Sequence, residues 1–172
     1  MNLELRKIEA EGTDFHFSQS AEDLEIAANG VKFPSAVEID LTATMIGDEI
    51  ICQGEIYTEV EIECSRCLDL FDMPIEAHLQ FVVQMIDSPQ ELESEDDDFE
   101  VIPKTQTTYD ISPRVRDAVT LSIPLKPLCR EDCKGLCPMC GTNLNENTCD
   151  CTPDKTDERW DALKNLFDEQ ME

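Results

Sequence analysis

Cysteine is the residue type whose spacing in this sequence most clearly predicts chemistry. Six of the nine cysteines lie in one short segment, LCREDCKGLCPMCGTNLNENTCDC, residues 128–151. A Cys-x2-Cys pair in a tight turn lets two thiolates approach one tetrahedral zinc ion. In CPMCG, Pro138 stiffens the turn, and Gly141 can adopt a positive φ that turns backbone N–H groups toward the sulfurs. We therefore predict a four-thiolate zinc ribbon or knuckle. Its ligands would be Cys137, Cys140, Cys149 and Cys151.

A second Cys-x2-Cys pair, Cys64 and Cys67 in CSRC, could join Cys129 and Cys133 in a second zinc site. That site would tie the sheet to the C-terminal module. Two alternatives stay open. There could be one site only, with the remaining thiols reduced and inert. Because a close Cys-x-Cys pair is less usual as half of a site, Cys129 or Cys133 could also replace one of the later ligands. An iron–sulfur cluster would use the same ligands, but the spacing gives it no specific support.

Disulfides and redox chemistry are the competing interpretations of the thiols. The start of the chain, MNLELRKIEAEGTDFHF, lacks the basic and apolar regions of a signal peptide, and no stretch approaches the ~20 apolar residues of a membrane span. We therefore expect a cytoplasmic protein, whose thiols stay reduced, and an odd number of cysteines also disfavours a closed set of disulfides. A redox Cys-x-x-Cys depends on a helix N-terminus, which neither pair is predicted to have, so a thiol redox protein is the weaker alternative.

The charge balance argues against nucleic acid as the main contact. With 13 Lys and Arg against 39 Asp and Glu, the formal net charge is −26. Such a field repels phosphate backbones and anionic lipid, whereas nucleic-acid binding normally depends on Lys and Arg. Direct RNA contact would need a local basic spot, which the chain would have if its two groups of cysteines meet. That spot comprises Arg66, Lys126, Arg130 and Lys134.

Alternating apolar residues predict three long consecutive strands near 37–45, 50–64 and 71–85. CSRC lies between the second and third strands, so the three should form an antiparallel meander with CSRC at one tip. Pro74 lacks a ladder donor, which predicts an irregular or edge position at the start of the third strand. Shorter strands are expected around 3–8 and 15–17.

Residues 87–100, DSPQELESEDDDFE, are strongly acidic and predict a solvated loop. A short helix should follow, capped by Asp110 or Ser112 and ended by Pro124. A closing helix is expected over 156–167, where apolar residues recur at helical spacing. The predicted fold class is thus α+β: an antiparallel sheet with a few short helices and a C-terminal zinc knuckle. The sheet domain would span 1–127, and the Cys-rich module with its closing helix would span 128–172.

No motif nominates an enzyme. Catalytic zinc usually has histidine or carboxylate ligands and an open position, but His16 and His78 lie far from the cysteines in sequence. Gly-rich phosphate loops, nucleophile elbows and His-Glu-x-x-His runs do not occur. We therefore expect structural zinc, one or two ions, and no small-molecule substrate. Cys52 should be a small buried apolar residue.

Several motifs together resemble the YceD-like family of large ribosomal RNA subunit accumulation proteins. The resemblance covers about residues 50–167 and is most specific in the segment Cys133–Asn145 with its two following cysteines. The other matching residues are Cys64, Arg66, Cys67, Leu68, Asp110, Ile111, Pro124, Leu128 and Cys129. One departure is Asp157-Glu158-Arg159, where family members often have Asp-Pro-Arg.

The resemblance implies a role in the synthesis, processing or stability of large-subunit ribosomal RNA, in bacteria or plastids. It carries over no catalytic residue. Some members keep only the first cysteine pair, which implies an accessory C-terminal module. Together with the net negative charge, the resemblance suggests an acidic adaptor that binds a basic ribosomal or assembly protein. Direct RNA binding by the basic spot is the alternative.

Overall fold

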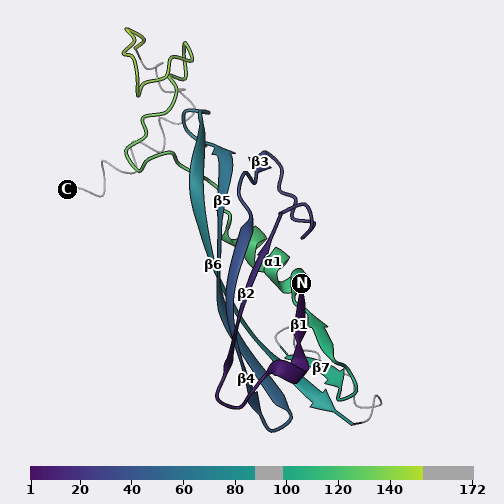
Figure 1. Cartoon of the computed structure of the whole chain (residues 1–172). Coiled ribbons are helices and arrows are strands. Elements are labelled where there is room, and N and C mark those ends of the chain that lie inside the picture. The colour runs from purple at the N-terminus through teal and green to yellow at the C-terminus, as the bar shows by residue number, and fades with distance from the viewer. Residues whose placement is uncertain (88–98, 153–172) are drawn as a thin grey trace, which may run out of the picture.

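A long, curved sheet forms the body of the protein (Figure 1). The computed structural model describes residues 1–87 and 99–152. Strands β4 (Val37–Ile46), β5 (Glu49–Glu63) and β6 (Leu70–Ile86) pair antiparallel in sequence order. Side chains in all three alternate between buried and exposed. The predicted meander is therefore confirmed.

Shorter strands extend this sheet. Among them, β2 (Thr13–Gln19) pairs with β4, and β3 (Val31–Lys32) pairs with β5. Strand β7 (Phe99–Pro103) runs parallel to the end of β6. The prediction of an acidic loop over 87–100 is therefore wrong at its C-terminal end, because Phe99 begins a strand. Residues 88–98 lie outside the described part.

Pro74 sits within the continuous register of β6, opposite Glu59 of β5. On the other side of β6, β7 pairs only with Val82–Ile86. Among the described residues, Pro74 therefore lies at a sheet edge, where its missing N–H costs no ladder hydrogen bond. The edge prediction is confirmed, and the strand is not interrupted there.

One face of the sheet carries the main core. It is covered by α1 (Ser112–Ser122), by the pair β1 (Asn2–Glu4) and β8 (Thr108–Asp110), and by the short 3-10 helix η1 (Leu5–Lys7). Val115 and Val119 of α1 are fully buried. Cys52 of β5 is also fully buried in this core, as predicted.

One of the two expected helices lies within the described residues. Within the described residues α1 is the single α-helix, so the fold is mostly β. The residue at its N-cap is Ile111 rather than Asp110 or Ser112. Asp110 instead accepts hydrogen bonds from the backbone and hydroxyl of Ser112. The helix expected over 156–167 lies outside the described residues. None of the described helices has the length and apolar content to cross a membrane.

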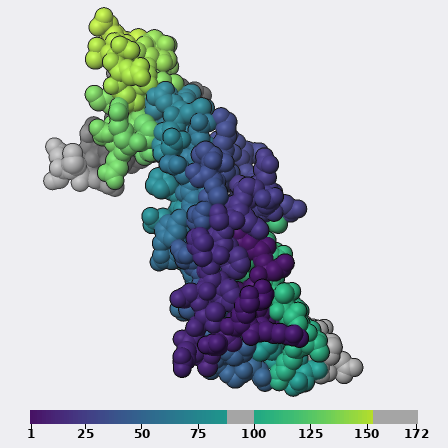
Figure 2. All heavy atoms as spheres, viewed as in Figure 1, coloured from purple at the N-terminus to yellow at the C-terminus, as the bar shows by residue number. Residues whose placement is uncertain are grey.

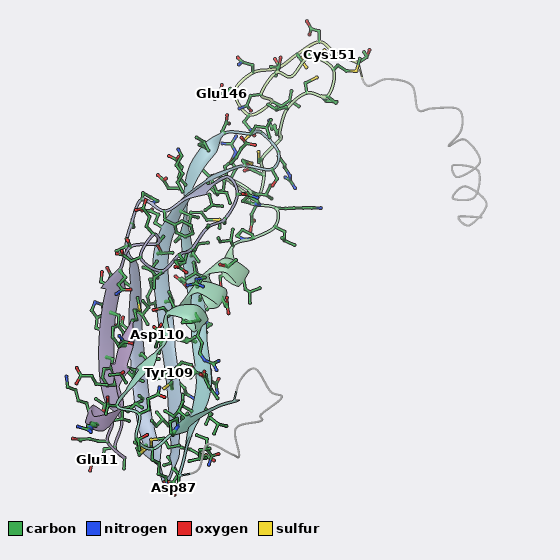
Figure 3. All side chains as sticks on the ribbon, turned by 90° about the vertical axis from the view of Figure 1, so that its right-hand side faces the viewer. Glu11, Asp87, Tyr109, Asp110, Glu146 and Cys151 are labelled. Carbon is green, nitrogen blue, oxygen red and sulfur yellow. The ribbon has the colours of Figure 1, made fainter. Side chains whose placement is uncertain are left out.

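The molecule is elongated, and the Cys-rich segment extends beyond one tip of the sheet (Figure 2). Glu146 and Cys151 lie at this end, whereas Glu11 and Asp87 lie at the opposite end (Figure 3). The β5–β6 tip that carries CSRC thus meets the C-terminal segment at one end of the molecule.

Candidate metal centres

The first group of thiols forms where the β5–β6 tip meets residues 127–133. The tip is a tight turn in which the Leu68 amide donates to the Cys64 carbonyl at 3.0 Å. The Ser65 amide donates to the Pro127 carbonyl at 2.8 Å, which holds the incoming chain against the turn. Cys129 and Cys133 then lie beside the pair from the tip.

The sulfur spacing in this group fits one tetrahedral ion. The sulfurs of Cys64 and Cys133 are 3.8 Å apart, and those of Cys67 and Cys129 are 3.7 Å apart. Four sulfurs at ~2.3 Å from one zinc ion would be separated by about 3.8 Å. A disulfide needs about 2.05 Å, and all nine cysteines are free. The donor set therefore suits a closed four-thiolate structural site.

The second group is built on a small hairpin that follows the first. Residues 134–137 run antiparallel to 142–145, with a bridge between Leu136 and Asn143. At its turn the Gly141 amide donates to the Cys137 carbonyl at 2.8 Å. Four sulfurs here also lie within 4.8 Å of one another. They belong to Cys137, Cys140, Cys149 and Cys151.

The two Cys-x2-Cys turns share one backbone feature. The residue after the second cysteine has positive φ in both, +62° at Leu68 and +74° at Gly141. Glycine adopts this conformation without strain, whereas leucine does so at a cost of about 1–2 kcal/mol. Leu68 is also 54% exposed. Its conformation is maintained by the turn hydrogen bonds and by the packing of the first group.

The two groups differ in burial. In the first, Cys64, Cys67 and Cys133 are buried. In the second, Cys140 and Cys151 are exposed. An ion in the first group would be enclosed by protein, whereas one in the second would sit near solvent.

Local hydrogen bonds favour the thiolate forms of Cys64 and Cys133 in the first group and of Cys140 in the second. Burial opposes the charge on Cys64, but donation from the amides of Cys129, Cys67 and Arg66 lowers its pKa to about 6. The hydroxyl and amide of Thr142 lower the pKa of Cys140 to about 6. The pKa of Cys151 is raised to about 12, first by its contact with Cys140. Without metal, one thiolate of a group thus disfavours ionisation of its neighbours. A zinc ion would remove this effect, because its charge stabilises all four thiolates of a group.

The structure thus assembles the eight cysteines in the two groups that the sequence suggested. An arrangement with Cys129 or Cys133 in the second group does not match this geometry. The metal itself and the ligand roles remain predictions.

The four residues of the predicted basic spot all lie near the first group. The guanidinium of Arg66 donates from Nη1 to the carbonyls of Glu131 and Cys133, at 3.2 and 2.9 Å. Arg130 approaches Asp132 at 3.5 Å. Lys126 and Lys134 are exposed. Arg66 therefore has a structural task, which is to hold residues 131–133 against the tip.

Two asparagines were missed as residues of this site. Asn145 donates from Nδ2 to the sulfur of Cys133 at 3.3 Å, and Asn143 donates from Nδ2 to Asp69 at 2.8 Å. In the sequence both asparagines stand out only as members of the Cys133–Asn145 motif. Their position shortly after CPMCG is the one available signal, because the return strand of such a hairpin must pass beside the first group.

Comparison with known proteins agrees with the motifs. Residues 52–167 match the family described as "Large ribosomal RNA subunit accumulation protein YceD". An uncharacterised protein of Mycobacterium tuberculosis is 29% identical over 131 residues, which are 76% of this chain and 62% of that protein. The chain therefore spans less than two thirds of this relative. No solved structure matches the chain significantly.

Plant relatives share a shorter region. The chloroplastic "Large ribosomal RNA subunit accumulation protein YCED homolog 1" of Arabidopsis thaliana is 41% identical over 70 residues. These are 41% of this chain and 22% of the plant protein. The corresponding protein of Zea mays is 39% identical over 66 residues, 38% of this chain and 22% of that protein. Since the family match extends over well more than half of the 172 residues, the chain belongs to the YceD family of large ribosomal RNA subunit accumulation proteins.

Proposed function

We propose that this protein supports the accumulation of large-subunit ribosomal RNA as a non-enzymatic, zinc-containing acidic adaptor in the cytoplasm. It would bind a basic ribosomal or assembly protein, and zinc would staple its C-terminal module to the sheet. The eight thiolates of the two groups would hold the metal. Thiolate-only ligands in both groups, and the burial of the first group, suit a structural role in which the ion fixes the fold.

The observation that carries this proposal is the acidic open face of the sheet. We use this name for the side chains of β2, β4, β5 and β6 that point away from the core, a face over which no described helix or strand packs. Its carboxylates are Asp14, Glu38, Asp40, Glu49, Glu55, Glu59, Glu61, Glu63, Asp72 and Glu76. Lys32, which pairs with Glu61, lies at its rim.

Like charges stand directly opposite one another on this face. Asp40 of β4 faces Glu55 of β5, and Glu61 of β5 faces Asp72 of β6. Opposed like charges destabilise a sheet. His16 and Lys32 already pair with Asp40 and Glu61, so a basic partner would compensate the charge that remains on Glu55 and Asp72.

The face also has a concave region that could receive a side chain of a partner. A groove of about 790 Å³ lies over the centre of the sheet, lined by His16, Asp40, Gly54, Glu55 and His78, among others. His16, Asp40, Glu55 and His78 form one continuous row across the strands. Lysine and arginine fit such a site, because their charged heads can reach the carboxylates while their stems pack on the sheet.

Direct RNA binding is the alternative and depends on the basic spot. The guanidinium of Arg66 already donates to two backbone carbonyls, and Arg130 contacts Asp132. Asp69 and Glu131 lie in the same region and add negative charge. These contacts and acidic neighbours offset the positive charge of the basic spot, which favours the adaptor over direct RNA binding.

Purified components test the proposal. We expect the zinc-loaded protein to bind RNA-free large-subunit proteins in fluorescence anisotropy, with affinity that falls as salt rises, and to show no comparable binding to naked ribosomal RNA. Glu55→Lys with Glu76→Lys should abolish that binding. A matched control, Glu11→Lys with Glu22→Lys, makes the same charge change away from the open face and should retain most of it.

Binding to naked ribosomal RNA that is lost on Lys126→Glu with Lys134→Glu, both at exposed positions, would instead support the direct RNA contact. Equal loss in both double variants would show that only net charge matters, and the open face would then have no specific role.

A further inference from the structure

The two thiol groups are joined by a hairpin whose opposite ends belong to different groups. We call residues 134–145 the linking hairpin. Its turn carries Cys137 and Cys140 of the second group. Its base contacts the first group and the β5–β6 tip through Arg66, Asn143 and Asn145.

The contacts at the base are tight and specific. The Leu136 amide donates to the Arg66 carbonyl at 3.1 Å. A Cβ added at Gly135 would come within 2.9 Å of that same carbonyl, and Gly135 has φ +71°. The hairpin therefore approaches the tip as closely as backbone allows, and a side chain at this position would separate them.

Asn145 connects this base to a sulfur of the first group. Its Nδ2 donates to the Cys133 sulfur at 3.3 Å, and its Oδ1 accepts from the Lys134 amide at 2.8 Å. Asn143 orients it, since Asn143 Oδ1 accepts from both the backbone and the side chain of Asn145, at 3.0 and 2.9 Å. Donation to a metal-binding sulfur stabilises its thiolate and fixes its direction.

Both asparagines lie within the loop that the second group would close. Cys140 precedes them and Cys149 follows them. An ion bound by these two cysteines would therefore reduce the conformational freedom of residues 141–148. Ordering that segment positions Asn145 in advance against Cys133. An ordered first group in turn holds the base of the hairpin and brings the second group together.

We propose that the two groups bind metal cooperatively, and that Asn145 is the positioning residue that couples them. This rests on the zinc part of the proposed function. Filling the second group should raise the affinity of the first, and by thermodynamic linkage the reverse must hold by the same factor. The β5–β6 tip would then be stapled firmly only when both groups are filled.

A thermodynamic cycle on the full chain tests the coupling. Zn²⁺ is titrated against a competing chelator, and the amide NMR signals of Ser65 and Arg66 report the first group separately. Four proteins are compared: the wild type, Cys149→Ser with Cys151→Ser, Asn145→Ala, and the combination. Signals of β4 and β5 verify that the sheet is folded in each.

We expect the loss of the second group to weaken the first about 10-fold or more. Asn145→Ala should weaken it about 10–100-fold, the usual effect of removing a partner of a metal ligand. In the combined variant the two losses should not multiply. Asn145→Asp keeps the acceptor for the Lys134 amide but removes the donor to Cys133, so it should weaken the first group at least as much as alanine does.

Asn147→Ala is the matched control, because Asn147 uses its backbone amide in the same turn, toward Asn143. It should leave the affinity of the first group unchanged. The proposal is overturned if the first group keeps its affinity without the second, or if the two losses multiply as independent effects do. Independent filling of both groups would overturn the coupling alone, whereas failure of both to bind zinc would overturn the zinc staple as well.

Discussion

At the scale of residues, the thiols differ in what their surroundings allow. Cys140 is exposed, and its pKa of about 6 makes it mostly thiolate at neutral pH. Cys64 has a similar pKa but is buried. Burial raises the pKa of Cys52 to about 12. Reactivity toward an alkylating reagent should separate these three environments.

In the metal-free, reduced protein at pH 7, we expect iodoacetamide to modify Cys140 faster than Cys64 and to modify Cys52 only after unfolding. Added zinc should slow the modification of Cys140 strongly, because a bound thiolate is a poor nucleophile. Peptide mass spectrometry over time measures each rate. If zinc leaves the rate at Cys140 unchanged, this residue is no ligand, and the thiol redox alternative gains support.

Residue spacing in the sequence suggested both thiol groups, because Cys-x2-Cys turns have few structural uses. It could not identify Asn145 as a neighbour of Cys133. That contact depends on how the linking hairpin folds back, which is set by the bridge between Leu136 and Asn143 and by the glycine at 135. Arg66 was predicted near the first group, but spacing could not show its donation to backbone carbonyls.

At the scale of elements, the alternating pattern predicted β4, β5 and β6 because one face of each is apolar. It did not predict β7, which pairs with β6 in parallel after residues outside the described part. Nor did it predict the two-residue strand β3, since so short a segment has no measurable alternation. The pattern also gave no register, and only the register shows which carboxylates face one another.

Glu55→Lys should stabilise the folded protein. It replaces the repulsion between Glu55 and Asp40 by attraction across β4 and β5, an effect worth up to about 1 kcal/mol. Urea unfolding should therefore shift to a higher midpoint. Glu11→Lys, in an exposed turn, serves as the control for the change in net charge. A lower midpoint for Glu55→Lys would show that this repulsion is absent in solution.

His16 of β2 provides a pH-dependent test of the same face. Its Nδ1 lies 2.8 Å from Asp40 and its Nε2 lies 3.2 Å from Glu38, and the hydrogen bond with Asp40 is the main cause that raises the pKa of His16 above 6.5. The stabilisation is therefore fully present below pH 6.5 and is lost as pH rises through the pKa of the folded state.

NMR titration should show the pKa of His16 above 6.5 in the wild type and lower in Asp40→Asn. Asp48→Asn, in the β4–β5 turn, should leave the pKa of His16 at its wild-type value. An equal pKa in wild type and Asp40→Asn would mean that this pair does not form.

At the scale of the whole molecule, the Cys-rich segment extends beyond one tip of an elongated protein (Figure 2), whereas the acidic open face runs along the strands and ends at Glu63 beside the first group. The net charge of −26 was evident from composition. That ten carboxylates share one uncovered face of the sheet became visible only from the fold. The division into a sheet domain and a C-terminal module remains a prediction, and the hydrogen bonds between the β5–β6 tip and the linking hairpin connect the two.

The adaptor hypothesis is tested most directly by an affinity pull-down from native lysate, with mass spectrometry and RNA sequencing of the retained material. Zinc-loaded wild type is compared with Glu55→Lys/Glu76→Lys and with Glu11→Lys/Glu22→Lys, each with and without ribonuclease. If the adaptor hypothesis holds, basic large-subunit or assembly proteins remain bound after ribonuclease treatment and are lost only from the open-face variant. Retention of ribosomal RNA by all three, with proteins that disappear on ribonuclease treatment, would contradict it.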